Sequence, residues 1–329
     1  MLFSNILLRN NTASSVLSEM RQLNFLLLGK TGTGKSPTAN SILGRRDFHT
    51  RPSNSLVTTE VKCSQGVYKD DVINVIDTPG FSSVNSIREE EEMITENIKK
   101  SIGMSPGGIH AFLFVVWLGT RFTEENRDAL HLFRVIFGQK FLETNGIIVF
   151  TNGDLFLYMQ EEVGHDIRFD EWCRAQKGYL GDLIAECRYR CVLFENRHCD
   201  EAAKQKQMNT LVEHVKKFEC PYTLEHFLLY SNLHNKCLNL KEMFQREIDN
   251  LNLQIDRLGA MENADFTPVS GTLDELTCIL ADEDVGTGLL NDMKEQLTAV
   301  RNKIDCHVVE MQRIQQTARQ KNNSFCSIL

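Results

Sequence analysis

The chain has 329 residues, of which 42% are hydrophobic and 24% charged, and a formal net charge of -8 at pH 7. This size and composition indicate a soluble chain with one good core and an appendage. The acidic balance excludes broad electrostatic attraction to nucleic acid, so no nucleic-acid partner is expected. Ten cysteines without framework spacing predict reduced thiols and a cytoplasmic protein.

The first 22 residues are interpreted as an N-terminal tail, because they have neither the basic region nor the cleavage site of a secretion signal. From Leu23 to about Cys220, short apolar runs alternate with amphipathic helical stretches, which is typical of a doubly wound, mostly parallel sheet. The parallel strands are expected to start at Phe25, Val72, Ala111, Ile147 and Cys191, with an antiparallel hairpin over 57–77. Helices are expected after GKS and over 86–102, 123–137, about 169–186 and 200–218.

Residues 221–325 form a predicted α-helical extension, because apolar residues there recur at spacings of three and four. Two long amphipathic helices are expected, separated by a polar break over 259–272. The first carries Cys237, Leu240, Phe244, Ile248, Leu251, Ile255 and Leu258, and the second carries Leu290, Met293, Leu297, Val300, Ile304, Val308, Met311 and Ile314. Packing within the chain is favoured over an intermolecular coiled coil, because each run is short and irregular.

The sequence GKTGTGKS, from Gly29 to Ser36, matches the phosphate-binding loop pattern between an expected strand and an expected helix. Its glycines let backbone amides converge on phosphates, Lys35 places a charge there, and the Ser36 hydroxyl is expected to bind Mg²⁺. The alternative is a glycine-rich turn without a ligand. The predicted nucleotide contacts in this loop are Gly29, Lys30, Thr31, Gly32, Thr33, Gly34, Lys35 and Ser36.

Two further motifs follow expected strands. In VIDTPG, Asp77 is expected to hold a magnesium-bound water and Gly80 to sense a γ-phosphate, although DTPG is also a common turn. In FTNGD, Asp154 is placed to accept two guanine donors that adenine cannot present together, which favours a GTP site over an ATP-using enzyme. Asn196 is expected to close over the base or, alternatively, to cap a helix.

The segments GKTGTGKSPTANSILG, DTPGF, SPGGIHAFLFVVWLGTRFTEEN, VFTNGD and CRYRCVLFEN together resemble the AIG-type G domain of the GTPases of immunity-associated proteins, the GIMAP family. The resemblance covers about Leu23 to Phe218, so residues 23–220 are the predicted G domain. It implies a P-loop GTPase fold, binding of GTP or GDP with Mg²⁺, and a GTP-dependent homodimer formed across the nucleotide face.

The resemblance also implies roles for individual residues. Asn152, Asp154 and Asn196 take the base-binding role, although Thr151 and Asn152 replace the first two residues of the usual NKxD pattern. The switch-I threonine, which serves Mg²⁺ and catalysis, falls on Thr58 with Thr59 as the alternative. Thr50 is expected near the nucleotide.

Pro37 follows Ser36, where other G domains donate a backbone N–H to the α-phosphate. Proline has no such donor. Binding of GTP and GDP is therefore expected to be roughly ten- to a hundredfold weaker, unless Pro37 merely begins the helix.

Hydrolysis is expected to be slow. Phe81 stands where Ras-like enzymes carry a water-orienting glutamine, and its ring cannot hydrogen-bond water. Arg121 is the candidate arginine finger, supplied in trans by a second copy, with an ordinary exposed arginine as the alternative. A GTP-dependent scaffold that does not hydrolyse remains the second interpretation of the whole chain.

Two other groups of residues have a simpler interpretation. Cys187, Cys191, His198 and Cys199 have spacings unlike those of zinc knuckles, so buried thiols are expected rather than a metal site. The acidic run from Glu89 to Glu92 is expected to be a solvated helix face rather than a partner-binding patch.

The final four residues, 326–329, read CSIL, a CaaX box that predicts prenylation of Cys326. Residues 311–329 contain Arg313, Arg319 and Lys321 and no acidic residue, so a prenyl chain would be helped by attraction to anionic lipid. Peripheral attachment to the cytosolic face of a membrane is expected. The alternative is an unmodified tail.

Overall fold

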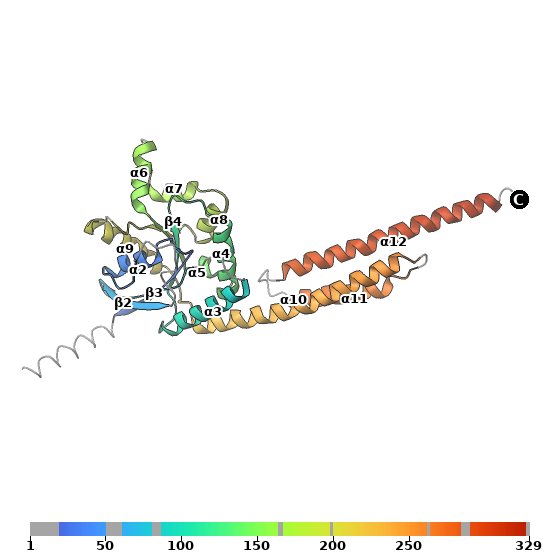
Figure 1. The fold of residues 1–329 in the computed structure, drawn as a ribbon, viewed down its shortest axis with the longest axis horizontal. Coiled ribbons are helices and arrows are strands. Elements are labelled where there is room, and N and C mark those ends of the chain that lie inside the picture. Colours follow the sequence, from blue (N-terminus) through green and yellow to red (C-terminus); the bar gives the residue numbers. More distant parts are fainter. Residues whose placement is uncertain are drawn as a thin grey trace, which may run out of the picture. The chain divides into compact units, whose positions relative to one another are not determined.

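The computed structural model describes residues 20–50, 61–80, 87–163, 167–197, 200–261, 264–283 and 290–326. Thr58, Thr59, Phe81, His198, Cys199 and residues 327–329 therefore lie outside the described residues, as do the side chains of Glu89–Glu92 and Cys326. The chain divides into two units, Met1–Tyr230 and Ser231–Leu329 (Figure 1).

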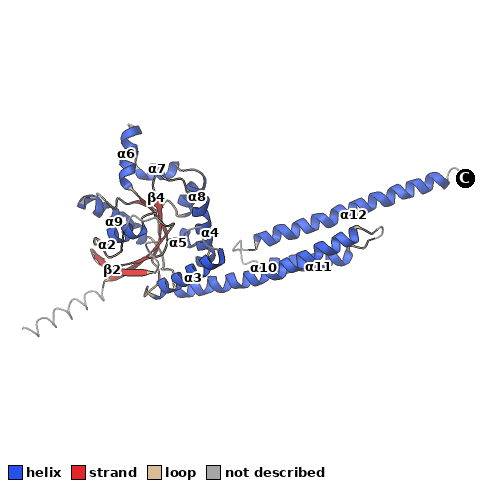
Figure 2. Ribbon diagram, in the orientation of Figure 1, coloured by secondary structure: helices blue, strands red, loops and turns tan. Residues whose placement is uncertain are grey.

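The first unit is built on a six-stranded sheet in the order β2-β3-β1-β4-β5-β6 (Figure 2). Only β2 is antiparallel to its neighbour, so the predicted mostly parallel sheet and the predicted hairpin are both present. The strands are β1 Arg21–Leu28, β2 Lys62–Tyr68, β3 Asp71–Asp77, β4 Ala111–Trp117, β5 Gly146–Thr151 and β6 Cys191–Leu193.

Helices cover both faces of this sheet. They are α2 Lys35–Leu43, α3 Ile87–Gly103, α4 Glu124–Phe137, α5 Phe141–Asn145, α6 Gly153–Val163, α7 Phe169–Ala175, α8 Gly178–Glu186 and α9 Glu201–Val215. The single helix expected over about 169–186 is wrong, because the chain turns extended at Gln176 and left-handed at Gly178. The helices α5 and α6 were not predicted from the sequence.

Strict alternation along the strands produces two cores. On β1, Leu23, Phe25 and Leu27 pack with α2 and α9, whereas Leu26 and Leu28 pack with α3, α4 and the helices that follow. Since successive side chains of a strand point to opposite faces, this pattern requires helices on both sides. The fold is therefore the predicted doubly wound α/β class.

The segment that precedes β4 is held at the edge of the sheet where β1 begins. Asn24 donates its side-chain amide to the carbonyls of Pro106 and Gly108, at 2.9 and 2.7 Å. Ile109 and Tyr222 exchange two backbone hydrogen bonds of 2.7 Å. Gly108 has φ +87°, and a Cβ there would lie 2.6 Å from the Tyr222 carbonyl oxygen. The PGGIH sequence therefore anchors the chain that leads into the helix α10, Leu224–Gly259.

The described part of the second unit contains three helical segments rather than the two predicted. They are the greater part of α10 Leu224–Gly259, then α11 Thr267–Glu283 and α12 Asn291–Cys326. α11 begins inside the predicted break. Pro268 does not prevent this, because it lies in the first turn of the helix, where a missing N–H breaks no intrahelical bond. The three helices share one core that includes Phe244, Leu273 and Leu297, so they pack within the chain.

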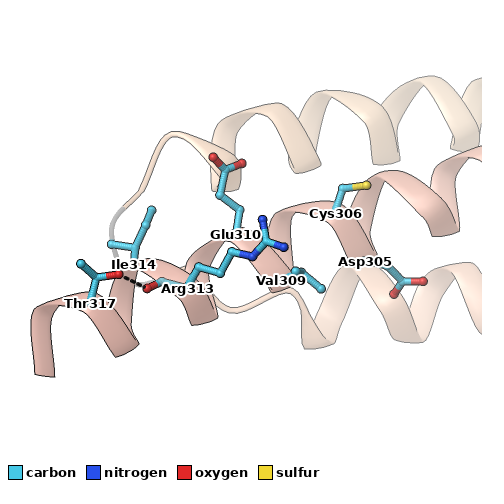
Figure 3. A pocket seen from close by; sticks show the side chains of 7 residues that line it. All are labelled: Asp305, Cys306, Val309, Glu310, Arg313, Ile314 and Thr317. Atoms are coloured by element: carbon cyan, nitrogen blue, oxygen red, sulfur yellow. Dashed lines mark hydrogen bonds between the residues drawn. The ribbon is translucent and has the colours of Figure 1, made fainter. Parts of the chain in front are cut away.

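α12 carries a groove whose described lining residues all belong to that helix (Figure 3). The lining residues are Asp305, Cys306, Val309, Glu310, Arg313, Ile314 and Thr317. The Thr317 hydroxyl donates to the Arg313 carbonyl at 2.8 Å, an ordinary contact within a helix (Figure 3). Among the described helices, none is both long enough and apolar enough to span a bilayer.

Candidate functional site

The loop between β1 and α2 depends on glycine for its conformation. Gly29, Gly32 and Gly34 have φ of +140°, +83° and +99°, a region that L side chains rarely adopt. A Cβ on Gly29 would also lie 2.6 Å from the Val115 carbonyl oxygen on β4. The loop therefore lies tightly against the carboxyl ends of the strands, which is the arrangement of a phosphate-binding loop.

Lys35 is folded under this loop. Its ammonium group donates to the carbonyls of Gly29 and Lys30, at 2.8 and 3.0 Å. Burial lowers the pKa of Lys35 to about 8, and the nearby Asp77 carboxylate opposes that shift. The group thus remains mostly protonated at pH 7, and a phosphate chain would add the negative charge that favours its charged form.

Ser36 and Asp77 bring the first two motifs together. The Ser36 hydroxyl donates to the Asp77 carboxylate at 2.5 Å, across 41 positions of sequence. The next residue, Thr78, fixes the end of β3 by donating its hydroxyl to the Leu27 carbonyl at 2.7 Å. A hydroxyl and a carboxylate in contact are hard oxygen donors that fit Mg²⁺.

Gly80 lies directly on the loop. A Cβ at this position would come within 2.5 to 2.7 Å of the side-chain oxygen, Cα and backbone nitrogen of Thr31. Only glycine allows this approach. The structure therefore brings the DTPG motif against the phosphate-binding loop.

Pro37 lies in the first turn of α2. The first described backbone bond of the helix runs from the Thr38 N–H to the Gly34 carbonyl, at 2.9 Å. Residue 37 is therefore at a position where helices have no intrahelical acceptor for the N–H. Proline leaves the helix intact and removes one outward-facing donor.

The strand ends of β5 and β6 form the predicted base-binding edge. The Thr151 hydroxyl donates to the Thr33 carbonyl at 2.8 Å, which ties β5 to the loop. Asn152 has φ +67°, a conformation that asparagine tolerates, and turns the chain into α6. Asp154 is exposed in the first turn of α6.

Glu195 was not identified from the sequence. One of its carboxylate oxygens accepts the backbone N–H of Asp154 at 2.9 Å, and the other accepts that of Arg197 at 2.7 Å. Asn196 beside it accepts the Ser41 hydroxyl at 2.7 Å and donates to Thr38 at 3.1 Å. Asn196 is not a helix cap, since Asp200 caps α9.

Other predicted residues lie apart from this cluster. Arg121 is exposed between β4 and α4, at the same edge of the sheet as the loop. Thr50 is exposed and makes no hydrogen bond within the described residues. The structure therefore joins neither of them to the phosphate-binding loop.

Cys187 and Cys191 are buried thiols, as expected. Burial raises the pKa of Cys187 to about 12, and a side-chain hydrogen bond with Cys173, together with burial, raises the pKa of Cys191. Within the described ranges, no three His, Cys, Asp or Glu side chains are grouped as metal ligands.

Comparison with known proteins gives one family. A model of the AIG1 family matches residues 23–246. Immune-associated nucleotide-binding protein 9 of Arabidopsis thaliana is 34% identical over 247 residues, which are 70% of this chain and 68% of that protein. Immune-associated nucleotide-binding protein 8 of the same plant is 32% identical over 216 residues, 61% of this chain and 56% of that protein. About a third or more of each relative lies outside the matched region.

The solved structures that resemble this chain share less sequence identity with it than these relatives do. Toc33 from Arabidopsis thaliana in complex with Mg²⁺ and GMPPNP has a TM-score of 0.45 and 18% identity, covering 63% of this chain and 90% of that one. Era in complex with MgGDPNP and a 16S ribosomal RNA segment has a TM-score of 0.41 and 16% identity, covering 60% and 57%. At these values the similarity says nothing about what this chain binds.

The position of Pro37 generates a prediction. Pro37→Ala should restore one backbone donor to the α-phosphate and tighten GDP and a GTP analogue by a similar factor, roughly ten- to a hundredfold. Calorimetric titration of both proteins with both nucleotides measures this. Equal affinities of variant and wild type, or a gain for the triphosphate alone, would show that Pro37 removes no α-phosphate contact.

Proposed function

The chain belongs to the AIG1 family, and from this premise we propose that it is a guanine-nucleotide-binding protein that holds GTP or GDP with Mg²⁺. Within the family we propose the GIMAP type. The observation that carries the proposal is the contact of Ser36 with Asp77 beside the buried Lys35, under a glycine-dependent loop. The relatives' name, immune-associated nucleotide-binding protein, supports a nucleotide as the ligand.

The phosphate chain would be held by the loop and by Lys35, whose ammonium already lies on two loop carbonyls. Ser36 and Asp77 would hold the magnesium ion, Ser36 through its hydroxyl and Asp77 directly or through a water. When bound, Mg²⁺ neutralises phosphate charge and polarises the phosphoryl oxygens.

Asp154 is the proposed determinant of base choice. Its backbone N–H is fixed by Glu195 and its carboxylate is exposed at the edge of the site. A carboxylate accepts both the N1–H and the N2–H₂ of guanine, whereas adenine presents no such pair of donors. This asymmetry favours GTP over the alternative, an ATP-using enzyme.

The variant Asp154→Asn tests whether Asp154 selects guanine. The amide replaces one acceptor by a donor, so GDP should bind roughly ten- to a hundredfold more weakly and xanthosine diphosphate, which has an oxygen at position 2, more tightly. Competition against a fluorescent guanine nucleotide measures both. Asp170→Asn, another exposed aspartate in the first turn of a helix, is the control and should change neither. ATP competing as well as GTP with the wild-type chain would contradict the proposal.

We propose slow hydrolysis that depends on a homodimer. Arg121 is exposed at the edge of the sheet that carries the phosphate-binding loop. In a homodimer whose two copies face each other across this edge, its guanidinium could reach the nucleotide site of the second copy. A cation supplied there would stabilise charge on the transferred phosphoryl group. Phe81 favours the second candidate, a GTP-dependent scaffold, because its ring offers no hydrogen bond to water.

Hydrolysis per protomer should therefore rise with protein concentration, and Arg121→Ala should abolish that rise while leaving nucleotide affinity unchanged. Arg127→Ala removes an equal charge from the exposed side of α4, where Arg127 lies over the Tyr179 ring, and serves as the control. The measurement is phosphate release over a range of protein concentrations. A rate that is independent of concentration and equal in all three proteins would favour the scaffold.

We propose that the protein is a cytoplasmic, peripheral membrane protein anchored by a prenyl group on Cys326. The support is the CSIL sequence behind a locally basic segment. The basic segment matters because a single lipid chain gives only marginal membrane binding. Attraction of its cations to anionic lipid adds to that binding.

Cys326→Ser should move the full-length protein from membrane to soluble fractions of cells able to prenylate it. Cys306→Ser, which removes an exposed thiol of the same helix, should leave the distribution unchanged. Fractionation and intact-mass analysis provide the measurement. A wild-type mass without a prenyl group in such cells would refute the anchor.

A further inference from the structure

Thr31 carries a buried hydroxyl inside the phosphate-binding loop. Its Oγ1 is shielded from solvent and has no hydrogen-bond partner among the described residues. The other threonine of the loop differs, since the Thr33 hydroxyl donates to the Lys30 carbonyl at 2.9 Å. A buried polar group without a partner is unfavourable, and at a binding site a ligand atom can supply the missing hydrogen bond.

The surroundings of this hydroxyl indicate which ligand atom that is. Thr31 faces Gly80, where a Cβ would lie 2.5 Å from the Thr31 hydroxyl oxygen and 2.7 Å from the Thr31 nitrogen. Gly80 is the glycine of the DTPG motif, whose backbone N–H senses a γ-phosphate in this class of site. The Thr31 hydroxyl therefore lies at the contact between the loop and the element that senses the third phosphate.

The positive charge of Lys35 near Thr31 also suits a phosphate group. The Lys35 ammonium bonds to the carbonyls of Gly29 and Lys30, the two residues that come directly before Thr31. In this loop pattern the lysine reaches the β- and γ-phosphates. A γ-phosphate between that ammonium and Gly80 would be next to Thr31.

We propose that the Thr31 hydroxyl donates a hydrogen bond to the γ-phosphate and makes the site discriminate a nucleoside triphosphate from a diphosphate. The inference rests on the proposed GTP site and assigns to Thr31, one of its predicted nucleotide contacts, the choice between triphosphate and diphosphate. Lys35 serves both nucleotides because it also reaches the β-phosphate, whereas Thr31 serves only the triphosphate. The alternative is that Thr31 only packs against Gly80.

The experiment compares Thr31→Val, which keeps the shape and removes the hydroxyl, with Thr31→Ser, which keeps the hydroxyl. Each protein is titrated calorimetrically with GDP and with GMPPNP in Mg²⁺, after thermal unfolding has shown that it is folded. Thr31→Val should weaken GMPPNP roughly ten- to a hundredfold and leave GDP within about twofold, because only a charged hydrogen bond to the third phosphate is lost. Thr31→Ser should restore most of the GMPPNP affinity.

Thr33→Val is the matched control, because it removes the loop hydroxyl that is bonded within the protein. It should affect GDP and GMPPNP by a similar factor. If Thr31→Val weakens both nucleotides equally, or neither, the Thr31 inference is overturned while the proposed function stands. If the wild-type chain binds neither nucleotide, the proposed function fails and the inference fails with it.

Discussion

The buried ammonium group of Lys35 is the constraint on which the site depends. A charge removed from water must be compensated by hydrogen bonds and opposite charge, or its pKa shifts toward the neutral form. Here two loop carbonyls and the Asp77 carboxylate provide partial compensation, and the pKa of Lys35 is still lowered to about 8. The phosphate chain of the proposed nucleotide would supply the remaining negative charge and would couple the loop, β3 and the ligand electrostatically.

The segments directly before and directly after β4 make different contacts in the first unit. At the amino end of β4, the PGGIH sequence accepts hydrogen bonds from Asn24 and pairs with Tyr222 ahead of α10. At its carboxyl end, Gly119 and Arg121 lie at the edge that carries the phosphate-binding loop. The segment from PGGIHA to GTRFTEEN therefore has two ends with different contacts. Half of it is a structural anchor for the chain that leads into α10, and only the other half can serve the proposed site.

The sequence predicted those features that repeat locally or follow a fixed motif. Apolar runs with β-branched residues located the parallel strands, and the order of strand, glycine loop and helix located Lys35 and Ser36. What it missed depends on contacts between distant residues. Glu195 holds Asp154 across 41 positions, and Thr31 meets Gly80 across the loop. α11 was missed because Pro268, interpreted as a break, occupies a first turn where proline is tolerated.

Thr151 replaces the asparagine of the NKxD pattern, and its contacts connect the end of β5 to the phosphate-binding loop. Its hydroxyl bonds to the Thr33 carbonyl, and its methyl group would be 3.1 Å from a Cβ on Gly34. It therefore contacts the phosphate-binding loop, and the proposed base choice falls to Asp154, whose backbone N–H is held by Glu195. Each of these residues lies at or just after the carboxyl end of a parallel strand, so their spacing is set by the register of the sheet. The loops need only short side-chain contacts to complete the site.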